Sequence, residues 1–120
     1  MGMAKKQVRA SSFVANQMTP DVQLVVFRKW RHCDDIIALF PELPSDLRGW
    51  YCDSYEHVGQ HGAADYRLVV LATTPARPED YGVLARELTN IGYTLRPIKR
   101  ASYQHHENRR QSAQQYVRSN

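Results

Sequence analysis

The chain has 120 residues and a mass of 13.9 kDa, and 42% of its residues are hydrophobic. This length suits one small domain with one hydrophobic core. No apolar run approaches the ~18 residues of a membrane-spanning helix, no secretory signal is recognisable, and the two cysteines, Cys33 and Cys52, make no disulfide framework. We therefore expect a cytoplasmic protein that binds no membrane and keeps both thiols free.

The net charge of +4 is concentrated at the two ends of the chain. Residues 1–20 contain three basic residues and no acid, and residues 101–120 contain three arginines and one glutamate, whereas residues 21–100 contain ten basic and eleven acidic residues. We predict a flexible basic N-terminal tail (1–20), one folded domain (21–100) and a polar, basic C-terminal tail (101–120). Such tails either serve solubility or attract phosphates without sequence preference, through Lys5, Lys6, Arg9, Arg109 and Arg110.

Two strands joined by a short connection open the predicted domain. Residues 22–30 are rich in β-branched and aromatic side chains, and residues 31–35 form a polar connection of hairpin length. Residues 36–40 are the predicted return strand. It should end before Pro41 and Pro44, because proline donates no hydrogen bond to a sheet.

The next part of the chain mixes strand and turn signals. Residues 50–58 predict a third strand whose two faces both carry polar side chains. Gly59 and Gly62 then predict a tight turn. The apolar run within residues 64–73 fits a buried strand or a helix, because so short a run shows no clear periodicity, and we interpret it as a strand.

A helix over residues 78–91 is the strongest pattern in the chain. Pro78 suits its first position, acids occupy its first turn, apolar residues recur with helical spacing, and Gly92 follows its end. Residues 93–99 predict a last strand at a sheet edge, because Pro97 interrupts it. From residue 101 onward no apolar helix face is present, so we expect this segment to be unfolded without a partner. The predicted fold is α+β: a small antiparallel sheet of about four or five strands with one main helix packed on one face.

Residues 55–66 gather the side chains best suited to recognition or chemistry. Histidines, carboxylates, tyrosines and a glutamine lie within a dozen positions. The predicted binding residues from this segment are Tyr55, His57, Gln60, His61, Asp65 and Tyr66. Imidazole and carboxylate groups suit hydrogen bonding and proton transfer. The segment matches no named catalytic signature, so we assign no catalytic residue and no cofactor.

A zinc site is an alternative interpretation of the same segment. Its ligands would be Cys52, His57 and His61, with Asp65 four residues further on. Cys52 and His57 are five positions apart on a predicted strand, so their side chains should point to opposite faces of the sheet. We therefore assign no metal site and retain these residues only as the alternative.

One basic and aromatic cluster lies in the body of the domain, at Arg28–His32. Arginine and aromatic side chains anchor protein interfaces, and they also stack on bases and pair with phosphates. We include Arg28 and Trp30 in the predicted binding surface. Nucleic acid contact through Arg28–Arg31 is the alternative to a protein contact.

Six short segments of the domain form a distinctive pattern. They are Phe27–Lys29, Ile37–Pro41, His57–His61, Ala64–Tyr66, Pro78–Tyr81 and Gly92–Tyr93. Over residues 24–100 this pattern resembles a group of small bacterial proteins, some of them encoded on plasmids and phages. Arg77 stands where a threonine is expected before Pro78. The resemblance implies a bacterial cytoplasmic protein linked to mobile elements, and it implies no particular activity.

These observations favour a small non-enzymatic accessory or regulatory protein that binds a macromolecule. A protein partner is the first expectation, nucleic acid is the second, and a homo-oligomer is compatible with the same surface. The alternative is a small metal- or ligand-binding enzyme that uses His57, His61 and Asp65.

Overall fold

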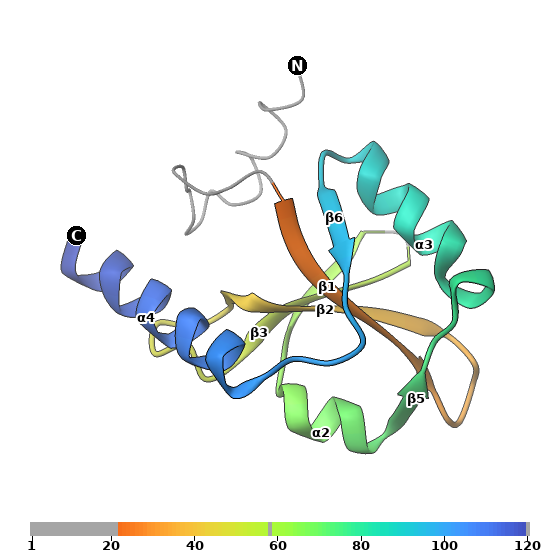
Figure 1. The fold of residues 1–120 in the computed structure, drawn as a ribbon, viewed down its shortest axis with the longest axis horizontal. Coiled ribbons are helices and arrows are strands. Elements are labelled where there is room, and N and C mark those ends of the chain that lie inside the picture. The colour runs from red at the N-terminus through yellow and green to blue at the C-terminus, as the bar shows by residue number, and fades with distance from the viewer. Residues whose placement is uncertain (1–21, 58, 120) are drawn as a thin grey trace.

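The computed structural model describes residues 22–57 and 59–119 (Figure 1). The strands are β1 Val22–Trp30, β2 Ile36–Pro44, β3 Cys52–Glu56, β4 Gln60–Ala64, β5 Thr73–Pro75 and β6 Thr94–Pro97, and the helices are α2 Tyr66–Leu71, α3 Pro78–Asn90 and α4 Tyr103–Ser119. The predicted N-terminal tail, with Lys5, Lys6 and Arg9, lies outside the described residues.

The six strands form one sheet in which β1 is central. The order is β4-β3-β2-β1-β5, and all of these neighbours are antiparallel. β6 pairs with the first part of β1 in parallel, while β5 pairs with the last part of β1 along the same edge (Figure 1). The α+β fold is confirmed. The predicted edge position of the strand that carries Pro97 is also confirmed, although this strand is parallel to its neighbour.

The predicted first hairpin is confirmed, since β1 and β2 pair antiparallel. Asp34 in its turn has a φ of 64°, a conformation that aspartate tolerates better than most residues. The return strand is longer than predicted: it passes Pro41 and reaches Pro44, with a register shift between Phe40 and Pro44. Pro41 donates no hydrogen bond there, and its carbonyl oxygen accepts one from Arg109 instead.

Both faces of the sheet are covered. One face packs against α3, and its core consists of Val25, Phe27, Ala38, Phe40, Tyr55, Leu84, Leu88 and Tyr93. The other face has its core at Val26, Ile37, Leu39, Cys52 and Ala64, with Tyr66 and Val69 of α2 packed on it. Because successive strand residues point to opposite faces, β3 contributes buried residues to both. The main helix on one face is confirmed as α3, and α2 covers part of the other.

Helix α3 follows the sequence pattern closely. It begins at the predicted Pro78, and the backbone N–H of Arg77 donates to the Asp80 carboxylate at 3.0 Å. Its buried side is formed by Leu84 and Leu88. Gly92, just after its end, has a φ of 117°, which a residue with a side chain rarely adopts.

The predicted strand within residues 64–73 is wrong. The Asp65 side chain accepts a hydrogen bond from the backbone N–H of Leu68 at 3.2 Å and so caps α2. The predicted turn is also shorter than expected. Of its two glycines only Gly59 has a positive φ, 76°, whereas Gly62 lies within strand β4.

The expectation that the C-terminal segment is unfolded is wrong, because α4 packs on the segment that follows Pro41. Arg109 is only 3% exposed, and it donates to the carbonyl oxygens of Gly49 and Pro41, both at 2.8 Å. Ala113, one turn further on, is fully buried. One arginine and one small residue thus replace the wide apolar face that the sequence lacks. No helix in the described part of the chain is long and apolar enough to cross a membrane.

Candidate functional site: a groove beside strand β4

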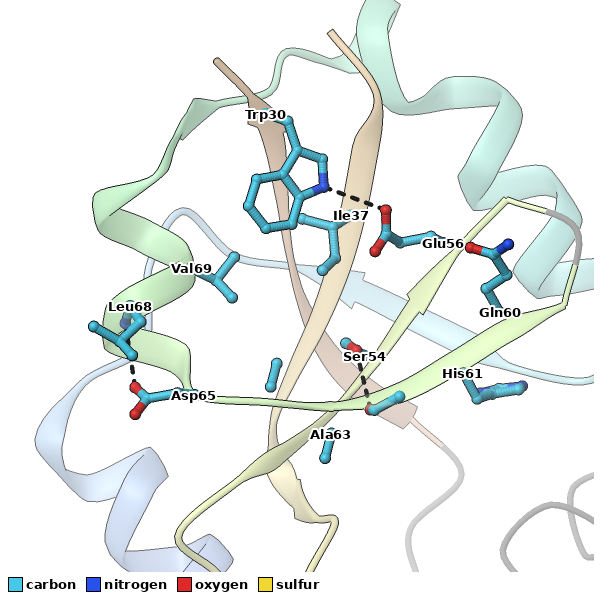
Figure 2. Close-up of a pocket in the computed structure, with 12 residues that line it drawn as sticks. Trp30, Ile37, Ser54, Glu56, Gln60, His61, Ala63, Asp65, Leu68 and Val69 are labelled. Carbon is cyan, nitrogen blue, oxygen red and sulfur yellow. Dashed lines mark hydrogen bonds between the residues drawn. The ribbon is translucent and has the colours of Figure 1, made fainter. Parts of the chain in front are cut away.

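An open groove of about 440 Å³ lies on the α2 side of the sheet, over β3 and β4 (Figure 2). Its lining residues come from β1 to β4 and from α2. They are Trp30, Ile37, Ser54, Glu56, Gln60, His61, Gly62, Ala63, Ala64, Asp65, Leu68 and Val69. A hollow of this size is within the range of small-molecule and peptide sites.

The groove has apolar walls above a floor of small residues. Figure 2 shows Leu68 and Val69 on the α2 side, and Trp30 with Glu56 along another side. Leu68 is 63% exposed, which is high for a leucine of a short helix. The Trp30 indole N–H donates to a Glu56 carboxylate oxygen at 3.3 Å, which fixes this side of the groove. The predicted binding residue Trp30 therefore does line a site.

Both charged side chains that line the groove are acids, Glu56 and Asp65. Among the residues that the structure describes, no lysine or arginine lines this groove. Asp65 also caps α2, so its position is tied to the start of that helix. Electrostatic complementarity therefore favours an occupant that carries positive charge.

Arg28 holds α2 in place and does not reach the groove surface. It is 8% exposed, and its guanidinium donates to the hydroxyl and carbonyl oxygens of Thr73 at 2.9 and 3.0 Å and to the carbonyl oxygen of Val70 at 3.1 Å. Burial lowers the pKa of this arginine. Arg28 was predicted as a binding residue; the structure places it behind the wall that α2 forms.

The imidazole rings of the predicted histidines lie around Tyr55 and Glu87 on the other side of the sheet, although His61 is also a lining residue of the groove. The buried Tyr55 hydroxyl donates to the Glu87 carboxylate and accepts from the backbone N–H of Gly59 at 2.9 Å. His57 Nδ1 lies 2.8 Å from the other Glu87 oxygen. The His61 ring meets the Tyr55 ring edge-on, with centroids 4.7 Å apart. Burial, and then the bond to Glu87, raise the pKa of Tyr55.

Glu87 is a residue that the sequence interpretation missed. It lies in α3 next to the buried Leu88, one turn after the buried Leu84, so it borders the apolar stripe of that helix. The signal in the sequence for a role of Glu87 is a carboxylate at the border of an apolar helix stripe. Its partner could not be named from the sequence, because Tyr55 lies 32 positions away.

Tyr66 connects three parts of the fold. Its hydroxyl accepts a hydrogen bond from the backbone N–H of Ala101 at 2.8 Å, and its ring lies edge-on to His106 with centroids 4.9 Å apart. Burial raises its pKa. The segment 55–66 is therefore divided among three places: Gln60 and Asp65 line the groove, the rings of Tyr55, His57 and His61 gather near α3, and Tyr66 lies under the start of α4.

The three alternative zinc ligands do not gather around one point. Cys52 is fully buried in the core on the α2 side, whereas His57 and His61 contact residues of the α3 side. Within residues 22–57 and 59–119, no group of three or more His, Cys, Asp or Glu side chains lies close enough together to hold a metal ion.

Cys52 should resist thiol reagents in the folded protein, whereas the exposed Cys33 should react at once. Burial raises the pKa of the Cys52 thiol from 9.0 to about 12. Because the folded chain then holds this proton more tightly than the unfolded chain, stability should be unaffected below pH 9.0 and should fall between 9.0 and about 12. The free energy of unfolding, measured across this pH range in the wild type and in Cys52→Ala, gives the contribution of this thiol. Equally fast labelling of both thiols in native buffer would contradict the burial of Cys52.

Of the basic residues predicted to meet phosphates, those in the described part of the chain have partners within the protein. Arg28 and Arg109 are buried and donate to backbone carbonyl groups. Arg110 pairs with Glu107 and lies over the Trp50 ring, 5.5 Å from its centroid. Arg31 donates to the Thr73 carbonyl oxygen at 3.2 Å. In the described residues these arginines form no continuous basic stripe of the kind that nucleic-acid readers carry.

No family model, curated protein or solved structure matches this chain. The resemblance to small plasmid and phage proteins therefore stays a prediction, and the groove itself carries the functional argument.

Proposed function

We propose that this chain is a small non-enzymatic accessory or regulatory protein that binds a protein partner in the groove between α2 and the β3–β4 hairpin. The observation that carries the proposal is the groove itself: a hollow of about 440 Å³ with exposed apolar walls and an acidic rim. An exposed leucine and a tryptophan beside small residues have the composition of an interface anchor site.

A protein partner is favoured over nucleic acid by the charges. The groove carries Glu56 and Asp65, which would repel phosphates, and Arg28 and Arg109 face inward. The enzyme alternative loses support for a geometric reason. His57 and the His61 ring lie near α3, whereas Asp65 caps α2 across the sheet.

The setting of this activity is also a proposal. The two free thiols, one exposed and one buried, suit a reducing, cytoplasmic compartment. The resemblance to plasmid and phage proteins supports a role linked to a mobile element.

A charge placed in the groove wall should abolish partner binding without unfolding the protein. Leu68 lies in the first turn of α2, where glutamate suits the helix dipole, so Leu68→Glu should fold normally. We would select binders on the full chain from a phage-displayed library of random linear peptides. Their affinity for Leu68→Glu should be at least about tenfold lower, because the variant removes an apolar contact and places a carboxylate against the apolar side chain that packs there.

Val83→Glu is the matched control for that variant. Val83 is 65% exposed, close to the 63% of Leu68, and it lies on α3 away from the groove. Selected peptides should bind Val83→Glu as they bind the wild type. A selection that yields no binders, or binders that do not distinguish Leu68→Glu from Val83→Glu, would overturn the proposal.

A further inference from the structure

The sheet has two edges, and they differ in how well their residues protect them against pairing with a further strand. On one edge, β5 has three residues and β6 has four, and each ends in a proline. Short strands and prolines are the usual protection of sheet edges. On the other edge, β4 has five residues, Gln60–Ala64, with neither proline nor a charged side chain. In the described part of the chain β4 pairs with β3 alone, and residues 60–63 are exposed.

The unprotected edge and the groove belong to the same strand. Four consecutive residues of β4, from His61 to Ala64, line the groove, and Gln60 lies at its far end (Figure 2). A strand added to β4 would therefore run beside the groove. Every second side chain of that strand would point to the groove side, because side chains alternate between the two faces.

We propose that the occupant of the groove is an extended, basic segment of the partner protein, which adds to the sheet as a strand along β4. This inference rests on the proposed function and names the partner chemistry. An apolar side chain of the segment packs against Leu68 and Trp30. A lysine or arginine two positions away, on the same face, meets the Glu56 carboxylate. Backbone hydrogen bonds to β4 supply affinity, and the groove supplies specificity, as in other cases of strand addition.

A second copy of this chain fits the same edge less well. Antiparallel pairing of β4 with β4 of a second copy would place both grooves on the same side of one continuous sheet. The carboxylates of Glu56 and Asp65 from both copies would then share that side, and the described lining residues include no lysine or arginine to offset them. The acidic rim therefore favours a basic segment of another protein.

Backbone methylation of a peptide tests the strand geometry directly. The probe is the tightest groove-dependent peptide from the phage selection, synthesised in two forms with alternate backbone nitrogens methylated. In an added strand only every second N–H points to β4. One form should therefore bind the full chain about tenfold or more weakly, and the other should bind within about twofold of the parent peptide.

The acidic rim gives the second measurement. Selected sequences should carry lysine or arginine two positions from an apolar residue, and Glu56→Gln should weaken their binding several-fold. Glu79→Gln, at an exposed position of α3, should leave binding unchanged.

The outcomes separate the two proposals. Peptides that need Leu68 but tolerate both methylation patterns equally would overturn strand addition and leave groove binding intact. Selected peptides that lack basic residues, or that bind Glu56→Gln as tightly as the wild type, would overturn the proposal that the segment is basic. A full chain that sediments as a dimer, and as a monomer when Leu68→Glu is introduced, would assign the groove to a second copy. The absence of any groove-dependent peptide would remove the proposed function itself.

Discussion

Gly49→Ala should detach helix α4 from the rest of the domain and lower the free energy of unfolding by about 2–4 kcal/mol. A β-carbon at this position would lie 2.8 Å from the Cα of Arg110 and 3.1 Å from the carbonyl oxygen of Arg109. Both neighbours are backbone atoms of a helix, so they cannot move without shifting α4. The φ of Gly49 is +76°, which adds about 1 kcal/mol or more of strain for alanine.

Gly59→Ala separates these two contributions. Gly59 has the same φ of +76°, but apart from its chain neighbours no described residue lies within 4 Å of the point that a β-carbon would occupy there. Its replacement should therefore cost only the backbone strain, about 1–2 kcal/mol. Urea unfolding of both variants, with amide exchange of the α4 residues, measures the difference. Equal destabilisation, or unchanged exchange protection in α4 of Gly49→Ala, would show that α4 does not depend on this close approach.

Arg28→Met should destabilise the protein by about 2–4 kcal/mol and loosen the wall of the groove. The guanidinium gives three hydrogen bonds to Thr73 and Val70 at 2.9–3.1 Å. Removing it takes away a donor from each of these acceptors at the end of α2, although Arg31 still reaches the Thr73 carbonyl oxygen. Arg28→Lys should rescue little of the loss, because a single ammonium group does not reproduce the planar fork.

Arg31→Met is the control for Arg28. Arg31 is exposed and donates to the same Thr73 carbonyl oxygen at 3.2 Å, so its loss should cost less than about 1 kcal/mol. Amide exchange of residues 66–72 should accelerate in Arg28→Met alone. If Arg31→Met were equally destabilising, or if α2 kept its protection in Arg28→Met, the anchoring role of Arg28 would be wrong.

Patterns that repeat along the chain were sufficient for much of the fold. The run of β-branched and aromatic residues in β1 and the proline, acids and apolar stripe of α3 are local signals, and the structure follows them. The strand interpretation of residues 64–73 failed because Asp65 acts as a helix cap there. The apolar run after it fits either structure, and the single capping residue decides between them.

Helix α4 shows the limit of reasoning from amphipathicity. Its anchoring depends on Arg109 meeting the carbonyl groups of Pro41 and Gly49, about sixty or more positions away. Nothing in residues 101–120 alone indicates these acceptors. Composition therefore suggested an unfolded tail, whereas long-range hydrogen bonds make it part of the domain.

Part of the predicted binding surface lies at the groove. Trp30, Gln60, His61 and Asp65 line it, and their binding role stays a prediction. Leu68 and Val69 are not among the predicted binding residues, because the wall that they form exists only when α2 is a helix. Successive side chains of β3 and β4 point to opposite faces of the sheet, so the histidine rings and the groove lie on different faces. The short distance between these residues in the sequence does not indicate this separation.

The most direct test of groove binding is a two-dimensional ¹H–¹⁵N NMR titration of the full chain with the tightest selected peptide. If the peptide binds in the groove, the signals of the Trp30 indole N–H and of the backbone amides of residues 60–64 and 68–69 will shift together and saturate with one affinity. Amides of residues 47–51 and 79–83, none of which lines the groove, should not move. Shifts centred on those residues, with Trp30 and β4 unchanged, would contradict groove binding.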